Sequence, residues 1–297
     1  MNFTFRGVRG SIASPGPKTM KYGGNTTCIE VRGDDNEIII LDAGTGIFPL
    51  AQRLLAELPL SCNIFITHTH WDHIQGLPFF TPLFIPGNKV TIHGAADPIN
   101  QRGINEVLAR QMEYAYFPIR EAELNAKIEY VSLIDRQTLE IGSARIENIL
   151  MNHPVMDYGY KISCGEKSLF FTGDHEWPCN IYEPEDDGYE EFEEEIQQQR
   201  KEKVDFIRGV DVLIIDTSYT DEEYYEKKGW GHGTFSASIA IAREAEVKHC
   251  FFTHHEPTRS DANLEKVFHE ALKKNEGGRI KNEPEFHLAQ EGVMFSL

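Results

Sequence analysis

The chain has 297 residues, 40% of them hydrophobic, and its 29 Lys and Arg against 47 Asp and Glu give a formal net charge of −18. This length is enough to bury a substantial core, and the ordinary apolar content argues against a disordered chain. The acidic excess disfavours a long nucleic acid or an anionic membrane as partner, because both are bound by basic surfaces. We therefore expect an acidic protein with a small-molecule partner.

Short β-rich runs alternate with helical stretches along the chain. Strands are predicted at 27–32, 37–41, 63–67, 89–93, 127–131, 144–150, 158–163, 168–172, 210–215 and 249–253. Helical periodicity falls at 47–57, 98–112, 235–245 and 263–274. No linker rich in Pro, Gly or Ser divides the chain, so we expect one domain over residues 1–297, of the layered α/β or α+β class.

The negative charge is concentrated in one segment. Nine carboxylates and no basic residue occur from Glu183 to Glu195, which is half of the net charge. The surrounding residues 176–206 continue into Q-Q-Q-R-K-E-K and are predicted to form an exposed, acidic helical insertion within the domain. Such an insertion could serve as a lid or a subunit contact, or it could be a solvated helix that only aids solubility.

Cysteine usage and hydropathy indicate the compartment. The five cysteines are scattered without a C-x-x-C pair, which fits neither a zinc ribbon nor a disulfide framework. No apolar run of signal-peptide length opens the sequence, and none approaches the roughly 18 residues of a membrane span. We therefore expect a cytoplasmic location and no membrane partner.

The strongest functional signal is T-H-T-H-W-D-H at 67–73, directly after the apolar run N-I-F-I. Neutral imidazoles and a carboxylate suit zinc, manganese or iron. His68 and His70 can hold one ion, while Asp72 and His73 can hold another. Two cations about 3.5–4 Å apart can share a hydroxide and polarise a substrate oxygen. The alternative, a merely polar surface loop, is a poor explanation for this density of ligand types.

Three residues that follow later apolar strands can complete a dinuclear site. His153 follows E-N-I-L-M-N, Asp174 ends T-G-D, and His254 follows C-F-F-T. A carboxylate at Asp174 can bridge two metals. His255 competes for the last position, and we choose His254 because it directly follows the strand.

In this order the motifs resemble those of the metallo-β-lactamase superfamily, and the resemblance spans nearly the whole chain. It implies a four-layer αβ/βα sandwich with a dinuclear site at the edge between two sheets. It also implies two divalent metal ions, preferably zinc, with manganese or iron as alternatives. L-D-A-G at 41–44 resembles the first motif, so that Asp42 supports the site from beside it, although an acidic residue before a turn is a fair alternative. The implied ligands are His68, His70, His153 and Asp174 for one metal, and Asp72, His73, Asp174 and His254 for the other.

Two later motifs resemble the phosphodiesterase branch of this superfamily, which includes tRNase Z and cyclic-nucleotide phosphodiesterases. They are V-D-V-L-I-I-D-T-S-Y at 210–219 and G-W-G-H-G-T-F-S-A-S at 229–238. The match implies that His232 is a catalytic histidine that binds no metal and is oriented by Asp216. Such a histidine can donate a hydrogen bond to a phosphoryl oxygen or a proton to the leaving oxygen. The alternative is that His232 only precedes a helix capped by Thr234.

The charge of the chain guides the choice of substrate. A long RNA would be repelled by the acidic segment, so we expect hydrolysis of a small cyclic phosphodiester, preferably a cyclic nucleotide, by a metal-bridging hydroxide. Asp72, His232 and Asp216 are the expected catalytic residues. The alternatives are a tRNase Z-like endonuclease that processes RNA 3′ ends and, from another class, a non-catalytic binding protein of the same fold.

The N-terminal segment from R-G-V-R-G to Y-G-G-N-T-T-C resembles a group of bacterial and phage proteins of this fold that are described as cyclic-nucleotide phosphodiesterases. By that match Arg9, Ser11 and Asn25 are candidate substrate-binding residues. A surface hairpin with exposed cations is the competing interpretation. Relatives of this branch are often homodimers, and residues 101–117 could form either an interface or part of the core.

Overall fold

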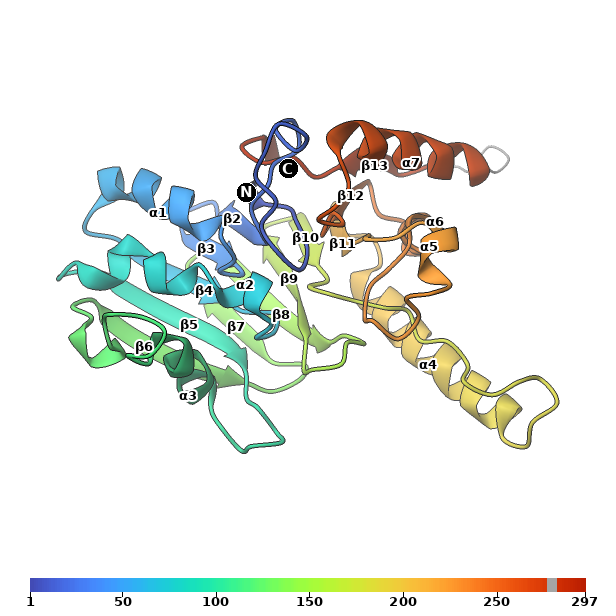
Figure 1. Ribbon diagram of the computed structural model, residues 1–297, viewed down its shortest axis with the longest axis horizontal. Helices are drawn as coiled ribbons and strands as arrows, with labels where there is room; N and C mark the ends of the chain where they lie inside the picture. Colours follow the sequence, from blue (N-terminus) through green and yellow to red (C-terminus); the bar gives the residue numbers. More distant parts are fainter. Residues whose placement is uncertain (277–281) are drawn as a thin grey trace.

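Two seven-stranded sheets face each other in the structure, a computed structural model that describes residues 1–276 and 282–297 (Figure 1). The first sheet has the order β14-β1-β2-β3-β4-β5-β6 and the second β13-β12-β11-β10-β9-β8-β7. The strands of the first sheet are β1 (Asn2–Gly7), β2 (Cys28–Arg32), β3 (Ile38–Leu41), β4 (Ser61–Phe65), β5 (Lys89–Ala95), β6 (Lys127–Leu133) and β14 (Met294–Ser296). Those of the second are β7 (Thr138–Ile141), β8 (Ala144–Leu150), β9 (Tyr158–Cys164), β10 (Lys167–Phe171), β11 (Val212–Asp216), β12 (His249–Thr253) and β13 (Glu285–Leu288).

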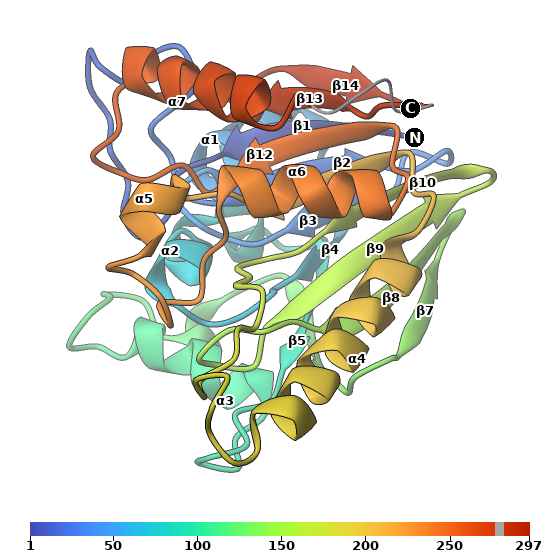
Figure 2. The same ribbon diagram turned by 90° about the vertical axis from the view of Figure 1, so that its right-hand side faces the viewer.

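Helices cover the outer faces of both sheets (Figures 1 and 2). On the side of the first sheet lie α1 (Ile47–Leu54), α2 (Trp71–Ile74) and α3 (Ile104–Ala109), with the short 3-10 helices η1 (Leu55–Glu57), η2 (Leu77–Phe79), η3 (Thr81–Phe84), η4 (Arg110–Met112) and η5 (Glu121–Glu123). On the side of the second lie α4 (Tyr189–Ile207), α5 (Asp221–Tyr224), α6 (Phe235–Glu244) and α7 (Asp261–Lys274). The result is the expected four-layer αβ/βα sandwich.

Three apolar clusters hold the layers together. The central cluster lies between the sheets and joins Phe3 and Phe5 of β1 to Phe171 of β10. A second packs the outer face of the second sheet against α4, α6 and α7, and a third packs the first sheet against α1. In α1 the buried residues recur at helical spacing, as in an amphipathic helix: Ile47, Leu50, Ala51 and Leu54. Because both sheets share the central cluster, we propose that residues 1–297 form one domain.

The direction of the strands gathers several loops at one edge of the sandwich. β3, β4 and β5 run parallel in the first sheet, and β10, β11 and β12 run parallel in the second. The carboxyl ends of parallel strands lie at one edge of a sheet, which is where ligands bind in open α/β sheets. The segments after β4, β10, β11 and β12 therefore converge.

Ten strands lie where they were predicted, whereas β1, β7, β13 and β14 were missed. Of these, β13 and β14 have no more than four residues and pair mainly with strands distant in the sequence, so that no local pattern reveals them. The predicted helix at 98–112 is wrong in its first part, because the backbones of Asp97 and Arg102 pair across a turn and α3 begins only at Ile104. Tyr114 and Tyr116 are 82% and 71% exposed and so are not core residues.

The acidic segment leads into and begins the helix α4, and only part of residues 176–206 is peripheral. Eight of its nine carboxylates, all but the partly exposed Glu193, are exposed. The remainder of α4 buries Ile196, Val204 and Ile207, the last two in the cluster that also contains α6 residues. The prediction of an exposed insertion over all of 176–206 is therefore wrong for the second half of α4, which forms part of the outer helical layer.

No helix within residues 1–276 or 282–297 is long and apolar enough to cross a membrane.

Candidate metal centre

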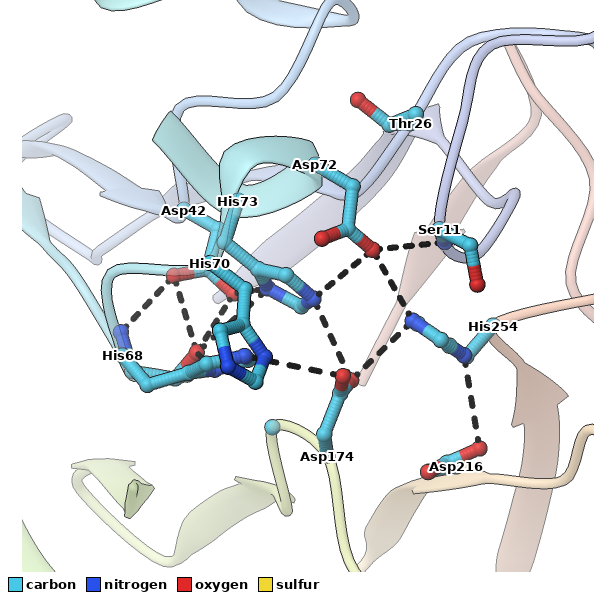
Figure 3. A network of polar contacts seen from close by, with 12 residues as sticks. Ser11, Thr26, Asp42, His68, His70, Asp72, His73, Asp174, Asp216 and His254 are labelled. Atoms are coloured by element: carbon cyan, nitrogen blue, oxygen red, sulfur yellow. Dashed lines mark hydrogen bonds and ion pairs between the residues drawn. The ribbon is translucent and has the colours of Figure 1, made fainter. Parts of the chain in front are cut away.

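The loop after β4 supplies four of the predicted ligands within one short stretch (Figure 3). His68 and His70 lie in the extended segment after β4, and Asp72 and His73 lie on the single turn α2. The turn is closed by the backbone N–H of His73, which donates to the carbonyl of His70 at 3.0 Å. This switch from extended chain to helical turn points all four side chains toward the space between the sheets.

The remaining predicted ligands arrive from the second sheet. His153 follows β8, Asp174 follows β10, and His254 follows β12. His254 has a φ of 58°, which turns the chain sharply after the strand. Its ring lies against Gly10, where an added Cβ would stand 2.2 Å from the imidazole, so the close approach requires glycine.

The ligand atoms form two clusters that share one carboxylate. In each cluster the four donor atoms lie within 4.8 Å of one another, and Asp174 belongs to both. His70 Nδ1 lies 3.1 Å from His153 Nε2, and His254 Nε2 lies 3.2 Å from Asp72 Oδ2. Zinc bonds of about 2.0–2.2 Å place neighbouring ligand atoms roughly 3.3 Å apart, so these spacings fit metal coordination. The clusters are His68, His70, His153 and Asp174, and Asp72, His73, Asp174 and His254.

Orphaned polar atoms show that these residues fit metal ions. His68 Nε2, His73 Nε2 and both carboxylate oxygens of Asp174 are buried and have no hydrogen-bond partner. Buried polar groups are almost always satisfied, because leaving them unpaired is costly. Two divalent cations would satisfy all four atoms at once. The nitrogen and oxygen donors suit zinc, manganese or iron and do not choose between them.

The other ring nitrogen of each buried ligand histidine is held by an outer partner. His68 Nδ1 lies 2.9 Å from Asp157, and His73 Nδ1 lies 2.8 Å from Asp42. His254 Nδ1 lies 3.0 Å from Ser218 Oγ. Such partners set the tautomer and leave the second nitrogen free for a metal. Asp42 thus takes the place expected of it.

His153 is held differently, by a backbone carbonyl. Its Nδ1–H donates to the carbonyl of Gly231 at 3.0 Å. Gly231 has a φ of 86°, and an added Cβ there would lie 2.3 Å from this nitrogen, so the contact needs a glycine. This bond joins the loop of His153 to the loop that carries His232.

Burial and neighbouring charges shift the pKa of two ligands, His68 and Asp72, toward the forms that bind cations. For His73, burial acts to lower the pKa, but Asp174 and Asp72 raise it well above its ordinary value. Burial, followed by the nearby His73, lowers the pKa of His68 well below its ordinary value, which keeps it neutral. Burial acts to raise the pKa of Asp72, but His73 and His254 bring it below its ordinary range. A neutral imidazole and an ionised carboxylate are the forms that bind metal.

His232 and Asp216 form a pair beside the two clusters. The Nδ1–H of His232 donates to Asp216 Oδ2 at 2.9 Å, and the same ring nitrogen lies 3.8 Å from Asp174. Asp216 is fully buried and also accepts from Ser218 Oγ at 2.9 Å. Burial acts to lower the pKa of His232, but Asp216 and other carboxylates raise it to about 9, which favours the proton-donating form. Thr234 caps α6 by accepting from the N–H of Ala237, as the alternative interpretation expected, so the case for a catalytic role of His232 depends on its contact with Asp216.

Of the predicted substrate-binding residues, only Ser11 lies at the site, where its backbone N–H donates to Asp72 Oδ2 at 2.6 Å (Figure 3). Arg9 is fully buried, and its guanidinium donates to the carbonyls of Gly23 and Arg259. The side-chain amide of Asn25 donates to Glu291. The substrate-binding assignments of Arg9 and Asn25 are therefore wrong, because these groups tie the N-terminal loop to the rest of the fold.

His255 points away from the centre. It is buried, and its Nε2–H donates to the carbonyl of Ala289 at 2.9 Å. The choice of His254 over its neighbour therefore agrees with the geometry.

Three residues of the site escaped the sequence analysis. Asp157 lies in H-P-V-M-D-Y-G-Y at 153–160, and Ser218 lies in D-T-S-Y at 216–219. Both residues stand close in sequence to predicted site residues, but the sequence does not show which histidine each one contacts. Glu176 is 5% exposed and accepts from the backbone N–H groups of Gly229 at 2.8 Å and Gly231 at 2.7 Å. No local motif indicates a role for Glu176, because Gly229 and Gly231 lie 53 and 55 residues away in the chain.

The fold and the site together define a hydrolase with the metallo-β-lactamase fold, built to hold divalent metal ions. The chain belongs to the β-lactamase superfamily, since residues 37–255 match the family described as "Beta-lactamase superfamily domain". It is 23% identical over 328 aligned positions to ribonuclease Z of Staphylococcus aureus (strain Newman), with 100% of both chains covered.

Solved structures share the fold across the whole chain. The metallo-β-lactamase fold protein YhfI from Bacillus subtilis superposes with a TM-score of 0.67 at 18% identity, covering 99% of each chain. Unliganded yeast PDE1 superposes with a TM-score of 0.63 at 16% identity, covering 100% of this chain and 99% of that one.

Proposed function

We propose that this hydrolase cleaves a small cyclic phosphodiester, preferably a cyclic nucleotide, with two divalent metal ions. The observation that carries the proposal is the pair of the partly buried His232 and the fully buried Asp216, whose imidazole lies 3.8 Å from the predicted shared ligand Asp174. A proton donor at this place matches the need of phosphodiester cleavage, in which the leaving oxygen gains negative charge.

A cavity beside the first cluster supports a small substrate. It has a volume of about 580 Å³ and reaches Thr69 and His153. Among the described residues that line it there is no Lys or Arg, and much of the wall is apolar, including Ile99, Val107 and Met156. Such a wall suits an uncharged ring such as a base. It offers no positive charge to further phosphates, and Asp97 on its wall would repel them, which favours a substrate with one phosphodiester.

The position of each residue indicates its role in metal binding or in proton transfer. His68, His70 and His153 would hold one ion, Asp72, His73 and His254 the other, and Asp174 both. When bound, two such ions make water nucleophilic at neutral pH and polarise the phosphoryl group. Asp216 holds the His232 ring with its other nitrogen free, so that His232 can donate to the leaving oxygen.

A panel of cyclic nucleotides, together with a generic bis-aryl phosphodiester and a precursor tRNA, tests this proposal. We expect metal-loaded protein to hydrolyse at least one cyclic nucleotide. Asp72→Ala or His73→Ala should abolish the activity, and His232→Ala should lower kcat about 10²–10⁴-fold while the metal content is unchanged. Activity that survives in a chelated, metal-free preparation would overturn the metal-dependent mechanism.

The second candidate is RNA 3′-end processing, because the similarity to ribonuclease Z spans both full chains. Cleavage of the precursor tRNA at low enzyme concentration, without turnover of any cyclic nucleotide, would favour it. The acidic segment and a cavity without Lys or Arg among its described lining residues lead us to prefer the small substrate.

We also propose a homodimer and no membrane partner. The exposed Tyr114 and Tyr116 make residues 101–117 a candidate contact. Light scattering during gel filtration measures the mass, and a single-chain mass would contradict the dimer.

A further inference from the structure

Two histidines and a glutamate meet at the end of the second sheet opposite the metal centre. His249 begins β12, while Glu285 and His287 lie on the edge strand β13. In the parallel pairing of these strands His249 is opposite Glu285, and Phe251 is opposite His287. Side chains two apart on a strand share a face, so all three groups point to the same side of the sheet. This is the inner side, because Phe251 belongs to the central cluster. Figure 2 shows β12, β13 and β14 close together near the chain termini.

The distances between the donor atoms match metal coordination. His249 Nδ1 lies 3.3 Å from His287 Nε2 and 3.5 Å from Glu285 Oε2, and His287 Nε2 lies 3.9 Å from the same oxygen. With bonds of about 2.0–2.2 Å, ligand atoms of a tetrahedral ion stand roughly 3.3 Å apart. A small rotation of the exposed Glu285 side chain would bring all three distances to that value.

Aromatic rings hold the two imidazoles in place. Phe251 stacks on His287 with ring centroids 4.6 Å apart, and Phe295 of β14 packs edge-on against His249 at 5.0 Å. The side chains of His249 and His287 are 27% and 32% exposed, which leaves one side open for water ligands.

We propose that His249, Glu285 and His287 bind a third divalent transition-metal ion, of the zinc class, at a site separate from the catalytic centre. His249 begins β12 and His254 directly follows its last residue, about 16 Å of extended chain away, so this ion does not take part in the reaction. It joins β12 to the edge strand β13. Because an ion bound only to the folded chain stabilises it, the site holds the C-terminal edge of the sandwich in place.

Zinc titration of the full chain, with the catalytic centre already loaded, tests this site. Bound zinc is counted by mass spectrometry after desalting, for wild type and for His287→Ala, Glu285→Gln and the control His269→Ala, whose histidine is exposed on α7. We expect wild type and His269→Ala to bind one more zinc ion per chain than His287→Ala. Glu285→Gln, which keeps the shape of the side chain, should bind this ion at least about tenfold more weakly.

Thermal unfolding gives a second readout that does not depend on activity. The last equivalent of zinc should raise the Tm of wild type and of His269→Ala by several degrees, and that of His287→Ala not at all. Phosphodiesterase activity should be equal in all variants. Equal zinc content in wild type and His287→Ala would overturn the proposal and leave the three groups as an ordinary hydrogen-bonded contact.

Discussion

Beside the metal centre, two carboxylates that are not predicted ligands each hold a neighbouring histidine ring. Asp42 and Asp157 are both fully buried carboxylates, and each faces the outer nitrogen of a ligand histidine. Burial raises the pKa of both, and for Asp157 the nearby Asp174 raises it further. A cation at the centre would offset this repulsion, so these carboxylates and the metals stabilise each other.

Removal of the Asp157 carboxylate should therefore lower metal affinity more than it lowers the activity of the metal-loaded enzyme. For Asp157→Ala we expect metal affinity to fall about 10–100-fold, with activity recovered at high metal concentration. Asp157→Asn, which can still accept from His68, should lose less. Metal affinity is measured by competition with a chromophoric chelator, with the exposed Asp187→Ala as the control. Unchanged affinity in Asp157→Ala would show that His68 needs no outer partner.

Glu30 on β2 plays a structural part far from the metals. Its carboxylate is 2% exposed and accepts from Arg6 at 3.0 Å, from Arg32 at 2.8 Å and from Arg53. Burial acts to raise the pKa of Glu30, but Arg6 and Arg32 lower it below its ordinary value. A depressed folded-state pKa means that this stabilisation is present above the unfolded pKa and is lost as the pH falls through the folded one.

We expect Glu30→Gln to lower the free energy of unfolding by about 2 kcal/mol at pH 7, because it leaves three guanidinium groups without their shared partner. The difference from wild type should narrow as the pH falls below the unfolded value of about 4.5. Urea unfolding at pH 7 and pH 4 measures both effects. The matched control is Glu129→Gln, whose ion pair is exposed, and it should change little. If the free energy of unfolding differs between wild type and variant by the same amount at both pH values, the lowered pKa of Glu30 does not contribute to stability.

At the scale of elements, the centre is assembled from loops, and hydrogen bonds between these loops hold them in position. Glu176 bonds to the backbone of residues 229 and 231 and to the hydroxyl of Tyr224, just before His232. Its own backbone N–H donates to the carbonyl of Asn152, which precedes His153. Through its side chain and its backbone N–H, Glu176 thus links the loop of the predicted ligand His153 to the loop of the proposed proton donor His232.

For Glu176→Gln we expect kcat to fall about tenfold, because the amide cannot accept from all three donors and His232 becomes less well placed. KM and metal content should stay close to wild type. Kinetics with a bis-aryl phosphodiester and metal analysis measure these quantities, and the exposed Glu226→Gln is the control. Equal loss of kcat and of metal would show that Glu176 supports the metal site instead.

At the scale of the whole molecule, charge is distributed unevenly. Half of the net charge of −18 lies between Glu183 and Glu195, and this segment precedes and begins α4. Figure 1 shows it at a tip of the molecule, far from the helices of the first sheet. Exposed charges act over about 8–10 Å at physiological salt, so the tip can repel a long polyanion while hardly affecting a small substrate in the cavity.

Neutralising part of this tip tests its role. In the fourfold variant Glu190→Gln, Glu191→Gln, Glu194→Gln and Glu195→Gln we expect hydrolysis of a small phosphodiester to stay within about twofold, while RNA binding at low salt becomes tighter. Filter binding at two salt concentrations gives the measurement. Unchanged RNA binding at both would mean that the helix serves solubility alone.

The sequence alone was enough to identify the class of fold and to predict a set of metal ligands that the structure brings together. His68 to His73, Asp174 and His254 follow apolar strands directly, and the ends of parallel strands meet at one edge, so local pattern determined their meeting. The ten predicted strands rest on the same kind of local signal.

Only the tertiary structure decided the rest. The contacts that the sequence did not reveal join residues that lie far apart in the chain. They are the hydrogen bonds of Arg9 and Asn25, the support of the site by Asp157 and Glu176, and the pairing of β1 with β14. Arg9 is the clearest case, because its charge in a loop suggested a substrate phosphate, whereas backbone carbonyls 14 and 250 residues away satisfy it. Hydrogen bonds of this kind depend on how the sheets pack, and no local pattern in the sequence records them.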